Sequence, residues 1–151
     1  MYERRQFLLR LTALMLAGPL VARAADAGPL VQVYKSPTCG CCGKWVDHLR
    51  AAGFTVQATN VADVNQYKLE YGVPMQLASC HTAIVEGYIV EGHVPADDVI
   101  KMLREKPAIK GIAVPGMPLG SPGMESPNPE RYETIAFDAD GNTTVFAIHE
   151  P

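Results

Sequence analysis

Four cysteines carry most of the chemistry that this sequence can perform. Three of them stand in the run Cys39-Gly40-Cys41-Cys42, and the fourth, Cys80, is followed directly by His81. Cys39 and Cys42 have the C-x-x-C spacing of thiol redox motifs. At the start of a helix, unpaired backbone N–H groups and the helix dipole favour the thiolate, which is both the nucleophile of disulfide exchange and a ligand for soft metals. The spacing alone therefore fits both functions.

The third thiol of the run distinguishes the two chemistries. Disulfide exchange needs one attacking and one resolving thiol, and Cys41 would compete for the mixed disulfide. Cu(I) prefers thiolate sulfur and accepts low coordination numbers, so bridging sulfurs can hold several ions. Zn²⁺ prefers a closed tetrahedron, which three thiols within four residues fit poorly. We expect Cys39, Cys41, Cys42 and Cys80 to bind more than one Cu(I) ion. A disulfide from Cys80 to one of the other three is the alternative.

Histidine and methionine side chains supply candidate accessory ligands. His81 follows the distant cysteine directly, so ligation or a hydrogen bond to a ligand is weighed against a structural role. Met117 and Met124 have thioether sulfurs that suit Cu(I), although methionine more often fills hydrophobic cores. His93 precedes a helix and is expected to cap or pack, whereas His48 is expected at the surface.

The elements predicted around these residues alternate between strands and helices. In chain order they are a strand over 30–34, a helix over 42–52, a second strand that starts over 54–56 and a helix over 62–71. Strands over 82–85 and 88–90, joined as a hairpin, follow, and then a helix that begins at Pro95. In the last helix we expect Val99, Ile100 and Leu103 to form the apolar stripe. The order β-α-β-α-β-β-α, with cysteines between the first strand and the first helix, predicts an α/β fold of thioredoxin-like type.

The chain changes character after residue 110. Residues 111–129 contain five prolines and four glycines, a density of turn residues that predicts a loop without regular structure. The apolar residues within this Pro/Gly-rich loop indicate that it packs, and we expect it to cover the cysteines. Residues 132–137 and 143–148 flank Asp140-Gly141-Asn142 and are expected to form a C-terminal β-hairpin.

The first 24 residues predict export. Arg4-Arg5 precedes an apolar run over 11–22, and Ala22-Arg23-Ala24 has the small residues that a signal peptidase recognises. The arginine pair resembles a twin-arginine export signal, and an ordinary basic leader is the alternative. We therefore expect a periplasmic protein with a single domain over 25–151. No membrane anchor is expected, because the apolar run is shorter than the roughly 20 residues that span a bilayer.

The predicted mature chain is acidic. The formal net charge of the whole chain is −3, and removal of residues 1–24, with four arginines and one glutamate, leaves −6. Nucleic-acid partners need a basic surface, so this class of function is excluded. Cysteines in exported chains commonly form structural disulfides, so a structural protein with two disulfides is a further alternative.

Several motifs in a fixed order resemble the CopG-like periplasmic copper-resistance family, once catalogued as a domain of unknown function. They are Tyr34 to Cys42 with Trp45, Ser79 to Ala83, Gly92 to Pro95, and Gly111 to Pro118 with Gly120 to Glu125. The resemblance covers nearly the whole predicted mature chain. It implies a thioredoxin-like fold, a periplasmic location and copper bound by the four cysteines.

Two functions follow as hypotheses. The first is a copper(I)-binding protein that sequesters the ion or passes it on under copper stress, with other periplasmic copper-handling proteins as candidate partners. The second is an oxidoreductase that cycles either a dithiol/disulfide pair or the copper itself. It rests on the predicted fold and on the C-x-x-C spacing of Cys39 and Cys42.

Overall fold

The computed structural model describes residues 27–151, so the predicted signal peptide lies outside the described residues. These residues form a mixed α/β fold, which confirms the predicted class. The elements are β1 (Leu30–Lys35), α1 (Gly40–Ala51), β2 (Thr55–Asn60), α2 (Val64–Glu70), the short 3₁₀ helix η1 (Met75–Leu77), β3 (His81–Val85), β4 (Tyr88–Gly92), α3 (Ala96–Glu105), β5 (Gly111–Val114), β6 (Tyr132–Phe137) and β7 (Thr143–His149).

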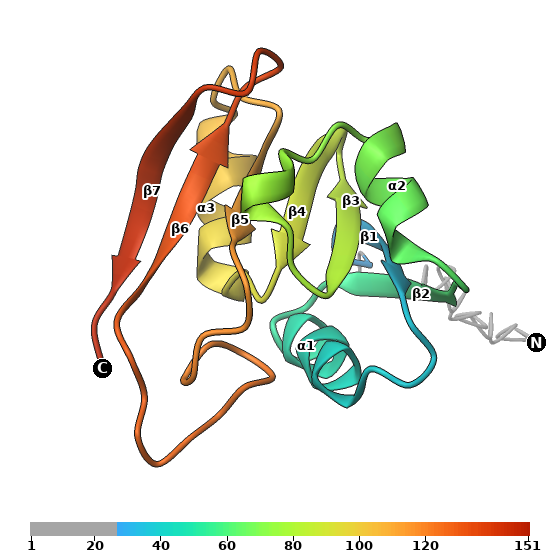
Figure 1. The fold of residues 1–151 in the computed structure, drawn as a ribbon, viewed down its shortest axis with the longest axis vertical. Helices are drawn as coiled ribbons and strands as arrows, with labels where there is room; N and C mark the ends of the chain where they lie inside the picture. Colours follow the sequence, from blue (N-terminus) through green and yellow to red (C-terminus); the bar gives the residue numbers. More distant parts are fainter. Residues whose placement is uncertain (1–26) are drawn as a thin grey trace, which may run out of the picture.

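The strands build one mixed sheet. Its order is β2-β1-β3-β4-β5-β6-β7, which Figure 1 shows from β2 on the right to β7 on the left. β1 runs parallel to β2, and β4 runs parallel to β5, whereas the other neighbouring strands are antiparallel. Of the antiparallel pairs that are consecutive in the chain, β3–β4 and β6–β7 are short hairpins, whereas the Pro/Gly-rich loop joins β5 to β6.

The two faces of the sheet carry different cores. Successive residues of a strand point to opposite faces, so Ala83 and Val85 of β3 pack with Trp45 of α1 in the larger core. Ile84 packs on the other face in the smaller core, with Phe137 of β6 and residues that flank α2 and η1. His81 therefore shares the face covered by α1 and α3, and Thr82 shares the face covered by α2.

The structure differs from the sequence-based expectations at two elements. Residues 111–114, predicted as part of an irregular loop, form the buried strand β5 between β4 and β6. In α3, Ile100 is 41% exposed, whereas Met102 is fully buried and takes the expected place of Ile100 in the apolar stripe. The C-terminal hairpin forms as predicted.

Within residues 27–151, none of the helices combines the length and the apolar character needed to cross a membrane.

Candidate metal centre

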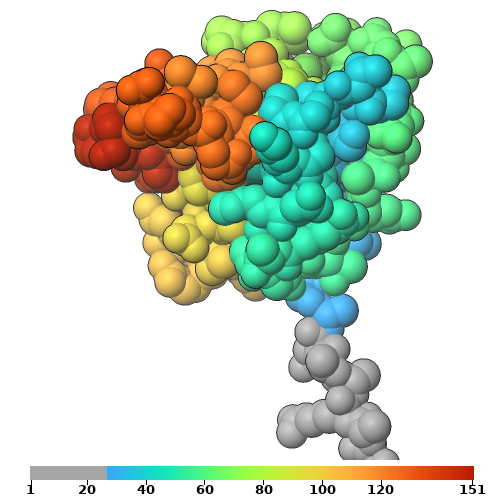
Figure 2. All heavy atoms as spheres, turned by 90° about the horizontal axis from the view of Figure 1, so that it is seen from below, coloured from blue at the N-terminus to red at the C-terminus, as the bar shows by residue number. Residues whose placement is uncertain are grey.

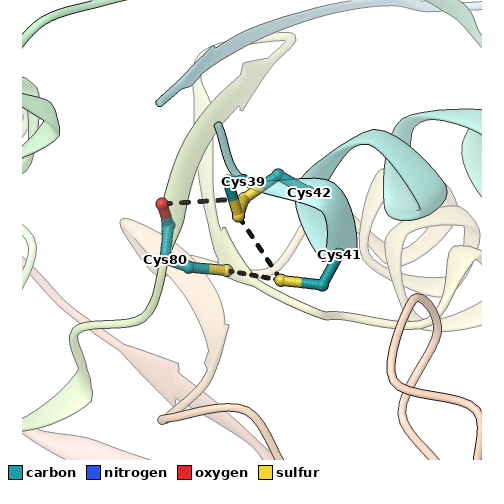
Figure 3. A group of neighbouring side chains, drawn as sticks. All are labelled: Cys39, Cys41, Cys42 and Cys80. Atoms are coloured by element: carbon teal, nitrogen blue, oxygen red, sulfur yellow. Dashed lines mark hydrogen bonds between the residues drawn. A yellow bond between two sulfur atoms is a disulfide. The ribbon is translucent and has the colours of Figure 1, made fainter. Parts of the chain in front are cut away.

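The first three cysteines lie where β1 turns into α1. Cys39 is the N-cap residue of α1 and its backbone N–H donates to the carbonyl of Ser36. Cys39 and Cys42 form a disulfide, and Cys42 is fully buried beneath the first turn of the helix. Cys41 is a free thiol on the outer side of the same turn. Figure 3 shows its sulfur turned away from the helix axis and toward Cys80.

The fourth cysteine completes a cluster of sulfur atoms. The Sγ atoms of Cys39 and Cys41 are 3.4 Å apart, and those of Cys41 and Cys80 are 4.0 Å apart. All four Sγ atoms lie within 4.8 Å of one another, and Figure 3 shows the four side chains converging. The structure therefore brings together the four cysteines that the sequence selected, and Cys41 lies between the disulfide and Cys80. The expected alternative, a disulfide to Cys80, is wrong, since Cys80 is a free thiol.

Burial keeps Cys80 protonated in the absence of a cation. Its desolvation, together with the neighbouring Cys41, raises the pKa of the Cys80 thiol to about 12. A soft metal ion must therefore displace a proton when it binds this sulfur.

His93 contacts this sulfur through a nitrogen whose protonation state the fold defines. The Nδ1 atom of His93 lies 2.8 Å from the carbonyl oxygen of Pro122. A carbonyl can only accept, so Nδ1 carries the proton and Nε2 presents its lone pair. Nε2 lies 3.0 Å from the Sγ atom of Cys80. A carbonyl that orients the second nitrogen in this way is the usual outer partner of a metal-binding histidine.

His93 was expected to cap or to pack: it is fully buried and packs beside His81, whereas the cap of α3 comes from His48. The backbone N–H of Ala96, in the first turn of α3, donates to Nε2 of His48 at 3.0 Å. Pro95 at the N-cap of α3 has no side chain that could accept this bond. His48 is half-buried rather than at the surface, and burial lowers its pKa. The occurrence of His93 in the Gly92–Pro95 motif was the one sequence signal that could have identified His93 as part of the cluster.

His81 lies deeper in the same cluster. Its ring is fully buried, with its centroid 4.3 Å from that of Trp45 and 5.4 Å from that of His93. Nδ1 of His81 lies 3.4 Å from the Sγ atom of Cys80. Burial lowers the pKa of His81 well below its usual value, so the ring is neutral. Its Nε2 is the one buried side-chain nitrogen or oxygen in residues 27–151 without a hydrogen-bond partner.

The Pro/Gly-rich loop lies over the cluster, as predicted. Figure 2 shows the loop in orange against α1 in teal. Met117 is 50% exposed, and its sulfur lies 3.9 Å from the Sγ atom of Cys41. Met124 contributes backbone hydrogen bonds to a turn within the loop, with Ser121 and Gly120. No hydrogen bond between its sulfur and the cysteines occurs in the described part of the chain. The structure therefore places one of the two candidate methionines against the thiols.

Two glycines allow this close approach. Gly123 has a φ of +94°, and a Cβ atom there would lie 2.6 Å from the carbonyl oxygen of Cys41 and 3.2 Å from Nδ1 of His93. Gly92 has a φ of +74°, and a Cβ atom there would lie 2.5 Å from the side chain of Ser79. Only glycine fits both the backbone conformation and the space. These positions seat the loop and the Cys80 turn against each other.

A buried ion pair holds the Cys80 turn from the other face of the sheet. Nζ of Lys68 lies 2.5 Å from Oε1 of Glu91, and these side chains are 3% and 0% exposed. The same Oε1 accepts the backbone N–H of Ser79 at 2.8 Å, one residue before Cys80. Thr82 hydrogen-bonds to both members of the pair. Sequence reasoning missed this network, because it depends on the pairing of Thr82 with Glu91 across the β3–β4 hairpin.

The donor set of the cluster suits a soft cation. In the described residues, the groups able to hold a metal ion consist of the four cysteines and of Cys80 with His81 and His93. Neither group contains a carboxylate, the ligand that hard cations such as Mg²⁺ and Ca²⁺ prefer. Thiolate and thioether donors suit soft ions such as Cu(I), and imidazole suits copper among other transition metals. His81 Nε2 adds a buried nitrogen without a hydrogen-bond partner among residues 27–151.

Comparison with known proteins identifies the family of this chain. A family model described as "Protein of unknown function, DUF411" matches residues 77–124, a segment that contains Cys80, His93 and Met117. No curated protein matches the chain. A solved structure of copper resistance protein CopG, form 2, is 42% identical with a TM-score of 0.77, and the match covers 81% of this chain and 98% of that one. Form 1 gives 42% identity, a TM-score of 0.76 and the same coverage. This chain therefore belongs to the family of copper resistance protein CopG.

Proposed function

We propose that this protein binds Cu(I) in the periplasm and contributes to copper resistance by sequestering the ion or passing it on. The observation that carries the proposal is the convergence of four cysteine sulfurs within 4.8 Å at the start of α1. The 42% identity to copper resistance protein CopG favours copper over other soft cations.

In the reduced protein, the thiolates of Cys39, Cys41, Cys42 and Cys80 are the main ligands. Because adjacent thiolates can bridge ions, the cluster binds more than one Cu(I). His93 is added to the proposed ligands, since its Nε2 lone pair faces Cys80. His81 and Met117 are accessory ligands at opposite depths, one buried in the core and the other half-exposed.

The predicted signal peptide supports the periplasmic location, where copper stress is met. The thioredoxin-like assignment rests on strand order and direction. In the unit β1 to β4, the order β2-β1-β3-β4 with β1 and β2 parallel and β3 antiparallel to β1 is the arrangement expected of that fold. Partners among periplasmic copper-handling proteins belong to the same proposal.

A thiol–disulfide or copper oxidoreductase is the second candidate. It is favoured by the Cys39–Cys42 disulfide at the N-terminus of α1, with the free Cys41 thiol beside it. A disulfide-reductase assay with a protein disulfide as substrate and a dithiol as reductant tests the dithiol version. Sustained turnover would favour that version, whereas a reaction no faster than that of the reductant alone would exclude it.

Copper titration tests the proposed function. The reduced protein is titrated anaerobically with Cu(I) in competition with a chromophoric Cu(I) chelator. We expect the wild-type protein to withdraw copper from the chelator, and Cys80→Ser to bind fewer ions. His48→Ala is the matched control, because His48 lies on the same helix as the cluster but caps α3. Failure of the wild-type protein to take up copper contradicts the proposal, and equal stoichiometry in both variants excludes Cys80 as a ligand.

A further inference from the structure

The four cysteines are divided into two chemically different pairs. Cys39 and Cys42 are joined in a disulfide, whose sulfurs are no longer thiolate donors. Cys41 and Cys80 remain free thiols. A cluster that needed all four thiolates would be lost in this form, so the question is what Cys41 and Cys80 can still bind.

The free thiols are spaced as ligands of one ion. Two sulfurs bound to the same ion at about 2.3 Å, in a trigonal arrangement, lie about 4.0 Å apart. The Sγ atoms of Cys41 and Cys80 are 4.0 Å apart, and the sulfur of Met117 is 3.9 Å from that of Cys41. Both distances from Cys41 thus match the edges of a three-sulfur site, the donor set that Cu(I) favours.

The surroundings keep these sulfurs available. Nε2 of His93 lies 3.0 Å from the Sγ atom of Cys80, so an imidazole nitrogen also faces the site. Met117 is 50% exposed in the Pro/Gly-rich loop, so it gives the partly buried thiols of Cys41 and Cys80 a route to solvent. Gly123 seats the loop against Cys41 without using either bridged cysteine.

We propose that the form with the Cys39–Cys42 disulfide retains a site for a single Cu(I), built by Cys41, Cys80 and Met117. Reduction of the disulfide then adds two thiolates and raises the copper capacity. The proposal rests on the proposed copper function and assigns its regulation: the redox state of one cysteine pair sets how many ions the protein holds.

The conversion between the two forms is a thiol–disulfide exchange with a dithiol. The two thiols of the reductant become a disulfide, and Cys39 and Cys42 become two thiols, so two electrons and two protons pass to the protein. The ion at Cys41 and Cys80 takes no part in the electron balance and remains Cu(I).

Copper counting in two defined redox forms tests the proposal. A small sample of protein purified without reductant is alkylated so that mass spectrometry counts its free thiols, and the untreated remainder of a preparation with two free thiols is kept for titration. That form and the fully reduced form are titrated anaerobically with Cu(I), and alkylation is repeated after copper removal. We expect one ion in the disulfide form, more than one in the reduced form, and two free thiols in the disulfide form before and after titration.

The outcomes separate this proposal from the proposed function. No copper in the disulfide form with copper in the reduced form overturns the proposal and leaves the function standing. No copper in either form overturns both. Three further results overturn the proposal. They are equal copper uptake by the two forms while the disulfide stays intact, loss of the disulfide when copper is added, and purified protein that has no free thiol.

Variants test the three ligands separately. Met117→Leu should weaken copper binding by the disulfide form about tenfold. Met75→Leu is the control, because Met75 is 56% exposed and makes no hydrogen bond to the cysteines in the described residues. The double variant Cys39→Ser/Cys42→Ser keeps Cys41, Cys80 and Met117 but removes the other two cysteines, and it should bind one ion after reduction. Equal affinity of the two methionine variants, or no copper in the double variant, contradicts the three-sulfur site.

Discussion

The β3–β4 hairpin carries a cluster of polar side chains on each face of the sheet, and the two clusters differ in how completely their polar atoms are hydrogen-bonded. On the face of α2, the side chains of Lys68, Thr82 and Glu91 each hydrogen-bond to the other two, at 2.5 to 3.0 Å. On the face of α1, Nε2 of the buried His81 has no partner in the described residues, and two imidazoles converge on the one thiol of Cys80.

The contrast distinguishes a structural network from a binding site. Burial raises the pKa of the Glu91 carboxyl, and the positive charge of Lys68 opposes that rise. The buried carboxylate is therefore stable only while Lys68 lies beside it. A buried network of this kind stabilises one arrangement of the chain. The cluster on the α1 face contains soft donors that protein groups satisfy incompletely, which is the condition that a metal ion relieves. The first network should therefore govern stability, and the second should govern copper binding.

The largest expected effect is on stability, from breaking the ion pair. Lys68→Met leaves the buried carboxylate of Glu91 without its cation, which should lower the free energy of unfolding by about 3–5 kcal/mol. This loss of unfolding free energy is measured by urea unfolding of the copper-free protein. The double variant Lys68→Met/Glu91→Gln removes both charges and should recover most of the loss. A decrease below about 1 kcal/mol in the single variant would show that the pair is not structural.

The largest expected effect on copper comes from Cys41→Ser. Cys41 lies between Cys39 and Cys80 and contacts Met117, so its loss removes the sulfur that the others share. Copper affinity of the reduced protein should fall at least about 100-fold, more than the loss of an outer partner of a metal ligand causes. The free energy of unfolding should change by less than about 1 kcal/mol, because Cys41 is partly exposed. An unchanged affinity would place copper elsewhere.

A smaller effect on copper is expected from His93→Gln. Loss of the nitrogen that faces Cys80 should weaken Cu(I) binding about 10- to 100-fold in chelator competition. His149→Gln is the control: His149 hydrogen-bonds to Asp98 at 2.8 Å, away from the cluster, so its loss should affect stability rather than copper. If the two variants bind copper equally well, His93 belongs with the structural groups and the contrast between the faces weakens.

The smallest effect is expected from Gly123→Ala, which tests the seating of the loop. The added Cβ atom would meet the carbonyl of Cys41, so copper affinity should fall about tenfold as the loop shifts. Gly141→Ala provides the matched control, because Gly141 has a φ of +84° but open space around its Cβ position. Both variants carry the backbone strain, and only Gly123→Ala should alter copper binding in the same chelator assay.

Local sequence patterns were sufficient for most of the fold. The strands and helices with clear apolar periodicity, such as α1 and the β3–β4 hairpin, form where they were expected. β5 was missed because its four residues lie in a segment rich in proline and glycine. Its strand conformation depends on pairing with β4 and β6, which come from distant parts of the chain. Local propensity does not encode such pairing.

The site was predictable in its cysteines and less so in its imidazoles. Cys39, Cys41, Cys42 and Cys80 were selected by residue type and spacing, and their sulfurs do converge. The capping role considered for His93 and the surface position expected of His48 were wrong, because both depend on how α1 packs against the start of α3. That packing places His48 at Ala96 and leaves His93 free to face Cys80.

The central claim is that the four cysteines form a Cu(I) site, and counting copper ions on the intact protein tests it most directly. The fully reduced protein is loaded with excess Cu(I) under anaerobic conditions, freed of unbound copper and examined by native mass spectrometry. The proposed cluster predicts a folded species that retains more than one copper ion, and a variant with all four cysteines changed to serine that retains none. A wild-type spectrum of copper-free protein alone, or equal copper retention by the variant, would contradict the claim.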